Sequence, residues 1–199
     1  SFGFYEARQV MVNLQEAKAI AQLLTPVLIV LSFLLAYREY RKSIWVRKQD
    51  LYIRLELAAI DLFKSEIERP ELKRIYSERI YEDLPNFEYF GGFSKENKAV
   101  YDHVACLLNL FEIHYNLRRS KDIQPEIFAS WLPWIYSVYT TPYFRWAWKD
   151  LQKHYVPDFR NFLNSLISSA DHATSEEVKQ KAFYETAAKL MKDKIIRNW

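Results

Sequence analysis

The chain has 199 residues, a length typical of one domain, with only three Gly and seven Pro beside 13 Phe, 14 Tyr and 6 Trp. Tight sheet turns and phosphate-binding loops depend on Gly, so this composition disfavours sandwiches, barrels and Gly-rich nucleotide folds and favours an all-α fold. A net charge of +3 from 28 basic and 25 acidic residues is too balanced to indicate nucleic-acid binding, and one cysteine excludes an intrachain disulfide framework.

The N-terminal part contains a candidate membrane span over residues 19–37. These 19 residues, AIAQLLTPVLIVLSFLLAY, are uncharged, and as a helix they would extend about 28 Å, close to the thickness of a bilayer's hydrocarbon core. A buried soluble helix and a cleaved signal peptide are the alternatives. The short segment 1–18 contains Glu6, Arg8, Glu16 and Lys18 and therefore no net charge, unlike the basic start of a signal peptide. The pattern predicts one uncleaved transmembrane helix.

Basic residues on the two sides of this segment predict its orientation. Two basic residues precede it, whereas six follow within about 17 residues: Arg38, Arg41, Lys42, Arg47, Lys48 and Arg54. The positive-inside rule then places residues 1–18 outside and the C-terminal part in the cytoplasm, as in a single-pass inner-membrane protein. The basic cluster is also expected to contact anionic headgroups, so the bilayer is a predicted partner.

Three polar residues lie within the predicted span. Gln22, Thr25 and Ser32 fall at spacings of three and seven residues, on one stripe of a helix. They are interpreted either as a stripe that faces neighbouring protomers or as polar residues without a special role.

The remaining chain predicts a helical bundle. No Gly or Pro occurs from Val27 to Arg69, which predicts one long helix that leaves the membrane, forms a basic stalk over 38–50 and enters the bundle domain, 51–170. Its apolar residues from Leu51 to Ile67 are typical of a central core helix. Further helices are expected over 70–80, 95–119, 122–140, 142–155 and 157–170. A capping box, Thr174 to Glu177, predicts a final amphipathic helix over 174–199, which either packs on the bundle, lies on the membrane or binds a neighbouring subunit.

No catalytic or metal-binding motif is found in the sequence. Phosphate-cradling glycine loops, HExxH and ExxH are absent. His103 and His114 would share a helix face about 16 Å apart, too far to bind one metal ion, while Asp150 and His154 supply at most two ligands. Cys106 lies in an apolar stretch and is expected to be a small core residue. We therefore predict no cofactor, no metal and no enzymatic activity.

The strongest polar candidates are charges set among aromatic residues. Glu112 follows Asn109-Leu-Phe, and Arg145 lies between Phe144 and Trp146. A buried Glu112–Arg145 pair that joins two helices is one interpretation, since an unpaired buried charge is costly. A ligand pocket formed with Trp148 and Tyr155 is the other, because an arginine beside aromatic rings can stack on a base or bind a phosphate.

The C-terminal half resembles a group of short bacterial proteins with an N-terminal membrane helix and a helical domain of unknown function. The shared spacing, N-x-F-E, then W, P-x-F-R-x-x-W and Y-x-x-x-F, falls here on Asn109, Phe111, Glu112, Trp131, Pro142, Phe144, Arg145, Trp148, Tyr155 and Phe159. In layout alone, the chain is similar to membrane-anchored accessory proteins of CRISPR and other anti-phage systems. That looser likeness implies an antiviral defence effector that forms a pore-like assembly in the membrane.

Three functions are therefore considered. The first is a non-enzymatic single-pass membrane protein whose cytoplasmic helical domain mediates homo-oligomerisation or binds a partner within a membrane complex. The second is a ligand or nucleotide sensor on a membrane anchor. The third, a ribonuclease of the higher eukaryote and prokaryote nucleotide-binding (HEPN) class, is disfavoured: its Arg is followed by His after four to six residues, whereas eight residues separate Arg145 from His154.

Overall fold

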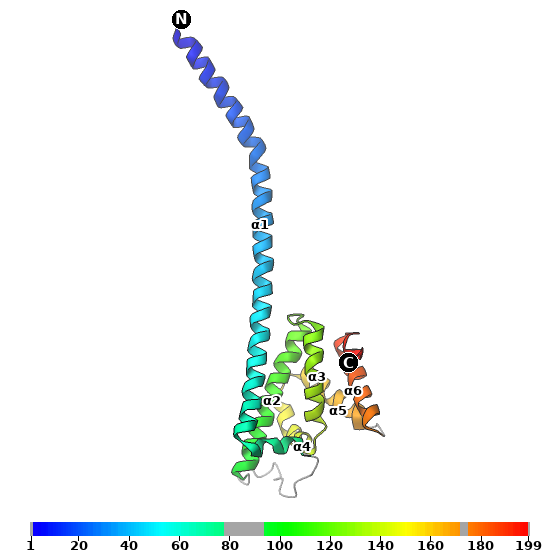
Figure 1. The fold of residues 1–199 in the computed structure, drawn as a ribbon. Coiled ribbons are helices and arrows are strands. Elements are labelled where there is room, and N and C mark those ends of the chain that lie inside the picture. Colours follow the sequence, from blue (N-terminus) through cyan, green and yellow to red (C-terminus); the bar gives the residue numbers. More distant parts are fainter. Residues whose placement is uncertain (1, 78–93, 172–174, 199) are drawn as a thin grey trace. The chain divides into compact units, whose positions relative to one another are not determined.

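The computed structural model describes residues 2–77, 94–171 and 175–198, without the side chains of residues 2–17, 19–21, 23 and 198. Every regular element over these ranges is helical, which confirms the all-α prediction. The chain divides into two compact units, residues 1–50 and residues 51–199. Helix α1, Phe2–Glu68, begins in the first unit and ends in the second (Figure 1).

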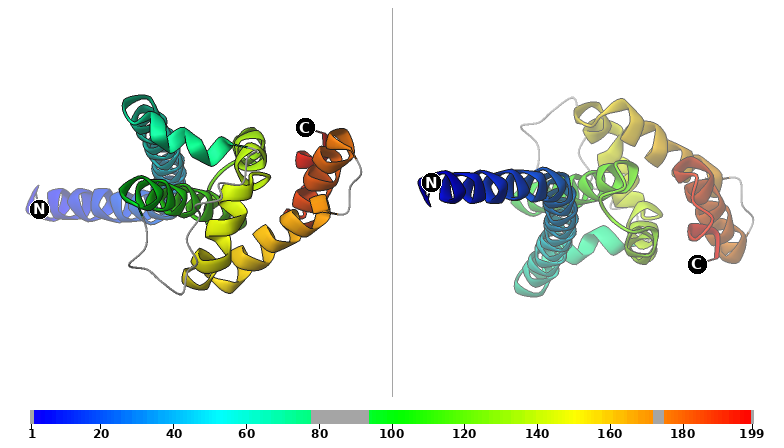
Figure 2. Two further views of the ribbon diagram at one scale, coloured as in Figure 1. Left: turned by 90° about the horizontal axis from the view of Figure 1, so that it is seen from below. Right: turned by 90° about the horizontal axis from the view of Figure 1, so that it is seen from above.

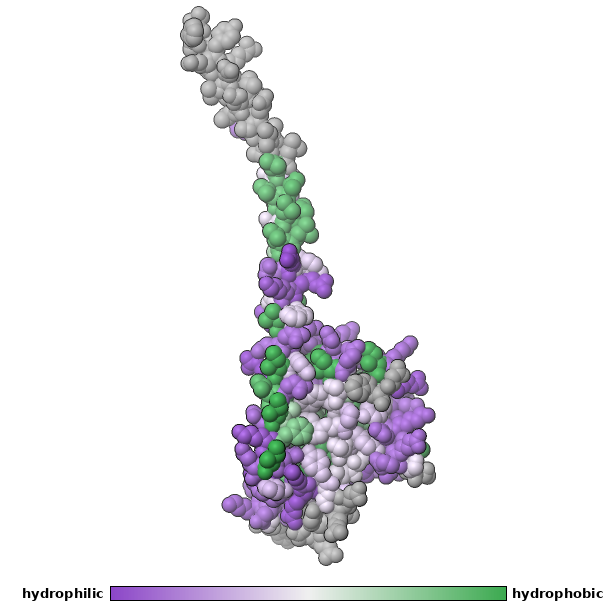
Figure 3. All heavy atoms as spheres, viewed as in Figure 1, coloured by the Kyte–Doolittle hydropathy of each residue, from purple (hydrophilic) through white to green (hydrophobic). Residues whose placement is uncertain are grey.

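The first unit is the N-terminal part of α1. Its large apolar side chains are exposed from Leu24 to Leu35, and they form a continuous apolar band in Figure 3. Among the described residues, no helix is both long enough and apolar enough to cross a bilayer. The predicted span, 19–37, includes residues 19–21 and 23, whose side chains lie outside the description.

The second unit contains the end of α1 and a set of shorter helices. Prolines open several of them, because a proline in the first turn needs no backbone donor: Pro70, Pro125, Pro142 and Pro157 each begin an element. The elements are η1, Pro70–Tyr76; α2, Lys95–Arg119; α3, Pro125–Tyr139; α4, Pro142–Leu151; η3, Gln152–His154; α5, Pro157–Asp171; α6, Glu176–Met191; and η4, Ile196–Asn198. The η elements are 3-10 helices. The helix predicted to begin at Pro70 is therefore a 3-10 helix, which is wound more tightly than an α-helix.

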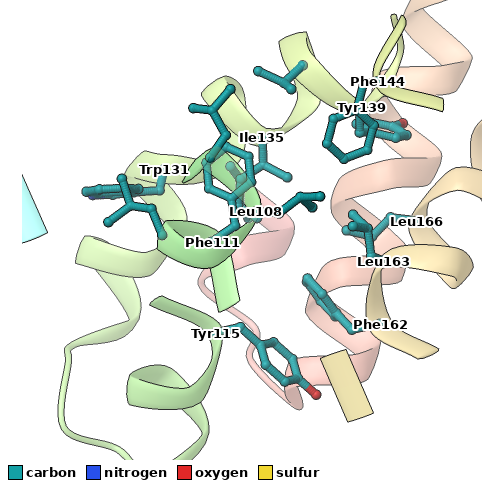
Figure 4. Close-up of a cluster of buried hydrophobic side chains, with 14 of the residues drawn as sticks. Leu108, Phe111, Tyr115, Trp131, Ile135, Tyr139, Phe144, Phe162, Leu163 and Leu166 are labelled. Atoms are coloured by element: carbon teal, nitrogen blue, oxygen red, sulfur yellow. The ribbon is translucent and has the colours of Figure 1, made fainter. Parts of the chain in front are cut away.

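Aromatic and aliphatic side chains of α2 to α6 form the core. Figure 4 shows Phe111 and Tyr115 of α2 among side chains from α3, α4 and α5. Phe162 of α5 lies 4.8 Å from Tyr115 between ring centroids, and Phe183 of α6 stacks at 5.0 Å on Tyr139 of α3. The abundance of aromatic residues therefore supplies the interhelical contacts of the bundle.

The part of α1 in the second unit is peripheral rather than central, which corrects the prediction of a core helix. Leu55, Ala59 and Glu66 are buried on its inner face. Other apolar residues remain 54–73% exposed; they are Ile53, Leu57, Ile60 and Ile67. Only one face of the helix meets the bundle, so these apolar residues stay exposed in the described part of the chain.

The C-terminal helix also differs from the prediction. The residue that caps α6 is Ser175, whose hydroxyl accepts a hydrogen bond from the Val178 N–H at 3.3 Å, so the cap lies one residue after Thr174, where the predicted capping box begins. The helix ends at Met191 because Lys192 adopts a left-handed conformation, φ 54°. Its Phe183, Tyr184, Ala187 and Ala188 are buried, and α6 packs on α5 (Figure 2). Packing on the bundle is thus the alternative that the structure supports.

Candidate functional site

A groove lies between the end of α1 and the first two-thirds of α2. The two helices run from Ala58 to Arg69 and from Lys95 to Ile113 along its walls, and its volume is about 790 Å³. This size falls within the range of small-molecule sites in proteins. Apolar residues line much of the groove, with charged residues at its edges. The apolar part of the lining consists of Ala58, Leu62, Leu72, Ala99, Leu110 and Ile113, together with Cys106. The polar part consists of Asp61, Ser65, Arg69, Lys95, Lys98, Asp102, His103 and Asn109.

A buried polar network lies beside this groove. The Nε2 atom of His103 on α2 lies 2.8 Å from Oε1 of Glu66 on α1, and both side chains are almost completely buried. The Tyr76 hydroxyl of η1 donates to the same carboxylate oxygen at 2.9 Å, and the indole N–H of Trp134 on α3 donates to the Tyr76 oxygen at 3.4 Å. Burial is the largest cause that raises the Tyr76 pKa, to about 12. The network therefore joins α1, η1, α2 and α3 through one carboxylate.

The chemistry available in the groove is that of binding rather than of an activated nucleophile. Cys106 is exposed there and is not the core residue that the sequence predicted. Partial burial, with a smaller contribution from the charge of Asp102, raises the pKa of its thiol, so the nucleophilic thiolate is disfavoured. Within the described residues, no cluster of three or more His, Cys, Asp or Glu side chains has the geometry to bind a metal ion.

The structure separates the two charges that the sequence predicted as a pair. Arg145 on α4 pairs with Asp171 at the end of α5, and its Nε donates to the Tyr139 carbonyl at 3.4 Å. Glu112 on α2 instead accepts a hydrogen bond from the Val156 N–H at 3.0 Å, just before α5 begins. Both charges are bound to the ends of helical elements. The predicted Glu112–Arg145 pair is therefore wrong.

Trp148 and Tyr155 do lie together, at 5.7 Å between ring centroids. The Trp148 N–H donates to the Asn164 side chain at 2.7 Å, and the Tyr155 hydroxyl donates to the Ala105 carbonyl at 3.2 Å. Burial, followed by the charge of Glu112, raises the Tyr155 pKa. These contacts hold the turn between η3 and α5 against α2, and neither residue lines the groove.

The histidines of α2 occupy different environments although they share a face. The His114 ring is buried and stacks on Trp131 at 4.1 Å and on Phe128 at 5.8 Å. Neither of its nitrogens makes a hydrogen bond of good geometry, and burial lowers its pKa to about 4, with the backbone of Ile127 offsetting part of the effect. His114 is thus a neutral core residue.

Asp150 has partners other than His154. Its carboxylate accepts a hydrogen bond from the Tyr101 hydroxyl at 2.6 Å and pairs with Lys153. Burial raises the Asp150 pKa, but Lys153 and Tyr101 stabilise the carboxylate more strongly, and the net pKa is lowered. His154 is exposed in η3, beyond the end of α4. The two predicted ligands therefore do not form the beginning of a metal site.

The residues predicted to act at a membrane are exposed on α1. Gln22, Thr25 and Ser32 are all exposed, and the Ser32 hydroxyl donates to the Leu28 carbonyl of its own helix at 2.8 Å. This internal bond satisfies the serine without a partner helix. The basic residues Arg38, Arg41, Lys42 and Arg47 are exposed, and Lys48 is half-buried.

Two buried polar contacts were missed by the sequence reasoning. Glu66 lies seven residues after Ala59 and eleven after Leu55, both buried, so helical spacing alone places an acid on the inner face of α1. Arg118 of α2 binds Asp193 at 2.7 Å, which fastens the end of α6 to the bundle. Asp193 lies in the stretch that was predicted as helix, and no local signal in the sequence indicates its partner.

Comparison with known proteins adds no assignment: no protein-family model, curated protein or solved structure matches this chain. The resemblance to short bacterial membrane-anchored proteins stays a prediction. The fold and the exposed surfaces are therefore the basis on which a function is proposed.

Proposed function

We propose that this chain is a non-enzymatic, single-pass inner-membrane protein whose cytoplasmic helical bundle mediates self-association. One observation carries the proposal: α1 exposes large apolar side chains in both units, as Leu24 to Leu35 in the first and as the apolar stripe of α1 (Ile53, Leu57, Ile60 and Ile67) in the second. Apolar surface of this extent in water is unfavourable and marks contact with lipid or protein. The non-enzymatic role follows from the catalytic motifs absent from the sequence.

The N-terminal apolar band supports a membrane anchor. Its exposed residues, Leu24, Val27, Leu28, Ile29, Val30, Leu31, Phe33, Leu34 and Leu35, cover every side of the helix rather than one face. Exposed Tyr37, Tyr40 and Trp45 follow, together with the basic cluster. Aromatic rings and basic side chains beside an apolar segment are typical of the interface between hydrocarbon and headgroups.

Membrane fractionation tests the anchor. Two lysines in the band, Leu28→Lys with Leu31→Lys, each oppose insertion by roughly 3 kcal/mol near the centre of a span, so the variant is expected in the soluble fraction. The control, Tyr40→Lys with Trp45→Lys, adds the same charge beside the band and is expected to stay in the membrane. Release of the wild-type chain by an alkaline carbonate wash contradicts the anchor.

The single cysteine tests the orientation. Cys106 is exposed in the second unit, so an impermeant maleimide labels it from whichever side of the membrane the bundle occupies. We expect labelling only after the inner membrane of spheroplasts is opened, and no labelling of Cys106→Ser. Labelling of intact spheroplasts means that the orientation is reversed.

The apolar stripe of α1 supports self-association. Ile53, Leu57, Ile60, Lys64 and Ile67 follow one another at spacings of four, three, four and three residues, the repeat of a coiled-coil seam. In the heptad pattern, Leu57 and Lys64 take the a positions and the three isoleucines take the d positions. Leu at a with Ile at d favours trimers or tetramers of parallel helices, and a single Lys at a fixes the register at some cost in stability. Copies anchored in one bilayer face the same way, which favours parallel packing.

The oligomeric state tests this interface. Leu57→Glu with Ile60→Glu is expected to convert an oligomer into a monomer in neutral detergent and in nanodiscs, measured by mass photometry. The bundle is expected to keep its helical content, because both side chains are exposed. Val178→Glu changes an exposed apolar residue of α6 and serves as the matched control. A monomeric wild-type chain refutes self-association, and with it a pore, because one helix cannot line a channel.

A further inference from the structure

The α1–α2 groove has two chemically different ends. Because α1 and α2 run in opposite directions along it, Arg69 at the end of α1 lies at the same end of the groove as Lys95 and Lys98 at the start of α2. The other end is mostly apolar: Ala58, Leu110 and Ile113 lie there beside Asp61 and Asn109, with Leu62 and Ala99 between the ends. Ile113 is 50% exposed and Cys106 is also exposed there. The groove therefore changes from basic to apolar along its length.

The charges at the basic end are only partly compensated. Lys98 pairs with Asp102 at 2.6 Å, and Arg69 pairs with Glu71 at 2.9 Å, with the side chains of both cations more than half exposed. Exposed pairs of this kind are weak and exchange partners at little cost. Lys95 adds a further positive charge at the same end. An anionic group placed there meets three cations within one turn of the two helix ends.

The length of the apolar wall fits an acyl chain. From Ala58 to Arg69 the α1 wall rises about 16 Å, which matches an extended medium- to long-chain tail. A flexible hydrocarbon tail packs on the apolar residues of this shallow groove without hydrogen-bond partners, while the exposed polar residues Asp61 and Asn109 stay in contact with water. The groove shares no residue with the apolar stripe of α1, so both surfaces remain available in the same chain.

We propose that the groove between α1 and α2 binds a free medium-chain fatty acid, with the carboxylate at Arg69, Lys95 and Lys98 and the tail along Leu62, Ala99 and Ile113. The buried Glu66–His103 pair supports the wall beside the tail and holds α1 at its distance from α2. This ligand site is independent of the proposed self-association, because the apolar stripe of α1 lies on a different face of the helix from the groove.

Protection of Cys106 from alkylation tests this site in the full chain. Cys106 lies in the groove, so a bound tail covers it. In nanodiscs of neutral lipid, we expect laurate to slow maleimide labelling of Cys106 at least tenfold, and dodecylamine, with the same tail and a positive head, to have little effect. Laurate that leaves the rate unchanged, or dodecylamine that protects equally well, overturns the proposal.

Variants at two exposed lysines and at the partly buried Ala99 test the carboxylate site and the tail site separately. Lys95→Glu with Lys98→Glu is expected to abolish protection by laurate, and Ala99→Trp is expected to abolish it by filling the groove. Lys181→Glu with Lys189→Glu makes the same charge change at exposed positions of α6 and is expected to retain full protection. Equal protection in the Lys95 and Lys98 variant and in the wild type overturns the assignment of the head site. None of these results depends on the oligomeric state, which is measured in the same samples by mass photometry.

Discussion

The buried imidazole of His114 makes the stability of the bundle sensitive to acid. Its pKa is about 4 in the folded chain because burial between Trp131 and Phe128 disfavours the charged form. An unfolded chain has a histidine pKa near 6.5. Between about pH 6.5 and pH 4, the His114 imidazole is therefore protonated in the unfolded state but stays neutral in the folded state. The contribution to stability is complete above that pH and is lost as pH falls toward about 4.

The size of this loss follows from the two pKa values. A difference of about 2.5 units corresponds to about 3 kcal/mol, and most of it is lost by pH 4.5. For a chain of this length that corresponds to a fall in Tm of roughly 6–12 °C. His114→Phe keeps an aromatic ring against Trp131 but cannot take up a proton. We expect the variant to lose markedly less Tm than the wild type between pH 7.5 and pH 4.5.

Thermal unfolding followed by near-ultraviolet circular dichroism in neutral detergent measures this difference. His154→Phe replaces an exposed histidine and is the matched control; it is expected to lose as much Tm on acidification as the wild type. Acid titration of carboxylates is common to all three chains and cancels in the comparison. If His114→Phe and the wild type lose the same Tm, the acid sensitivity does not arise at His114 and the reasoning is refuted.

Three further outcomes are expected. Glu66→Leu leaves the buried His103 ring without its hydrogen-bond partner, so the free energy of unfolding should fall by about 1–3 kcal/mol, measured by thermal unfolding, whereas Glu68→Leu at an exposed position should change it little. Asp193→Ala leaves the Arg118 guanidinium without its partner, so trypsin should cleave the C-terminal segment faster than in the wild type, and an unchanged cleavage rate contradicts a structural role. The rate of Cys106 alkylation should reach half its maximum at a higher pH than for a free cysteine, because burial raises the thiol pKa; a lower midpoint speaks against that environment.

Helix positions could be predicted from local signals alone. Ser94 caps α2 by accepting a hydrogen bond from the Asn97 N–H at 3.1 Å, and prolines begin α4 and α5 where expected, while Pro125 begins α3 three residues after the expected start. These signals act over one helical turn and need no tertiary contact. Helix α6 ends instead at a left-handed Lys192, and the segment after it is bound through Asp193 to a residue 75 positions away, so no local signal predicted this end.

The candidate site was predicted less well than the helices. Charged residues beside aromatic rings suggested a pair between Glu112 and Arg145. Predicting such a pair requires knowing which faces of the two helices pack against each other, and the sequence does not show this. Arg145 pairs with Asp171 instead, and the sequence did not predict the buried contact between Glu66 and His103. Cys106 was expected in the core since its neighbours are apolar, yet its own position on α2 opens into the groove. Local composition does not distinguish the two sides of a helix at a single position.

By itself, the sequence determined the helical class, most helix boundaries and the uncharged run of 19 residues near the N-terminus. These features depend on residue propensities and on charge along the chain, which are local properties. Only the tertiary structure decided which face of α1 is buried, since that depends on the partner helices available. It left Ile53, Leu57, Ile60 and Ile67 exposed and created the groove beside α2. The proposed interface and ligand site both follow from that packing, because one helix presents apolar residues on more sides than the bundle can cover.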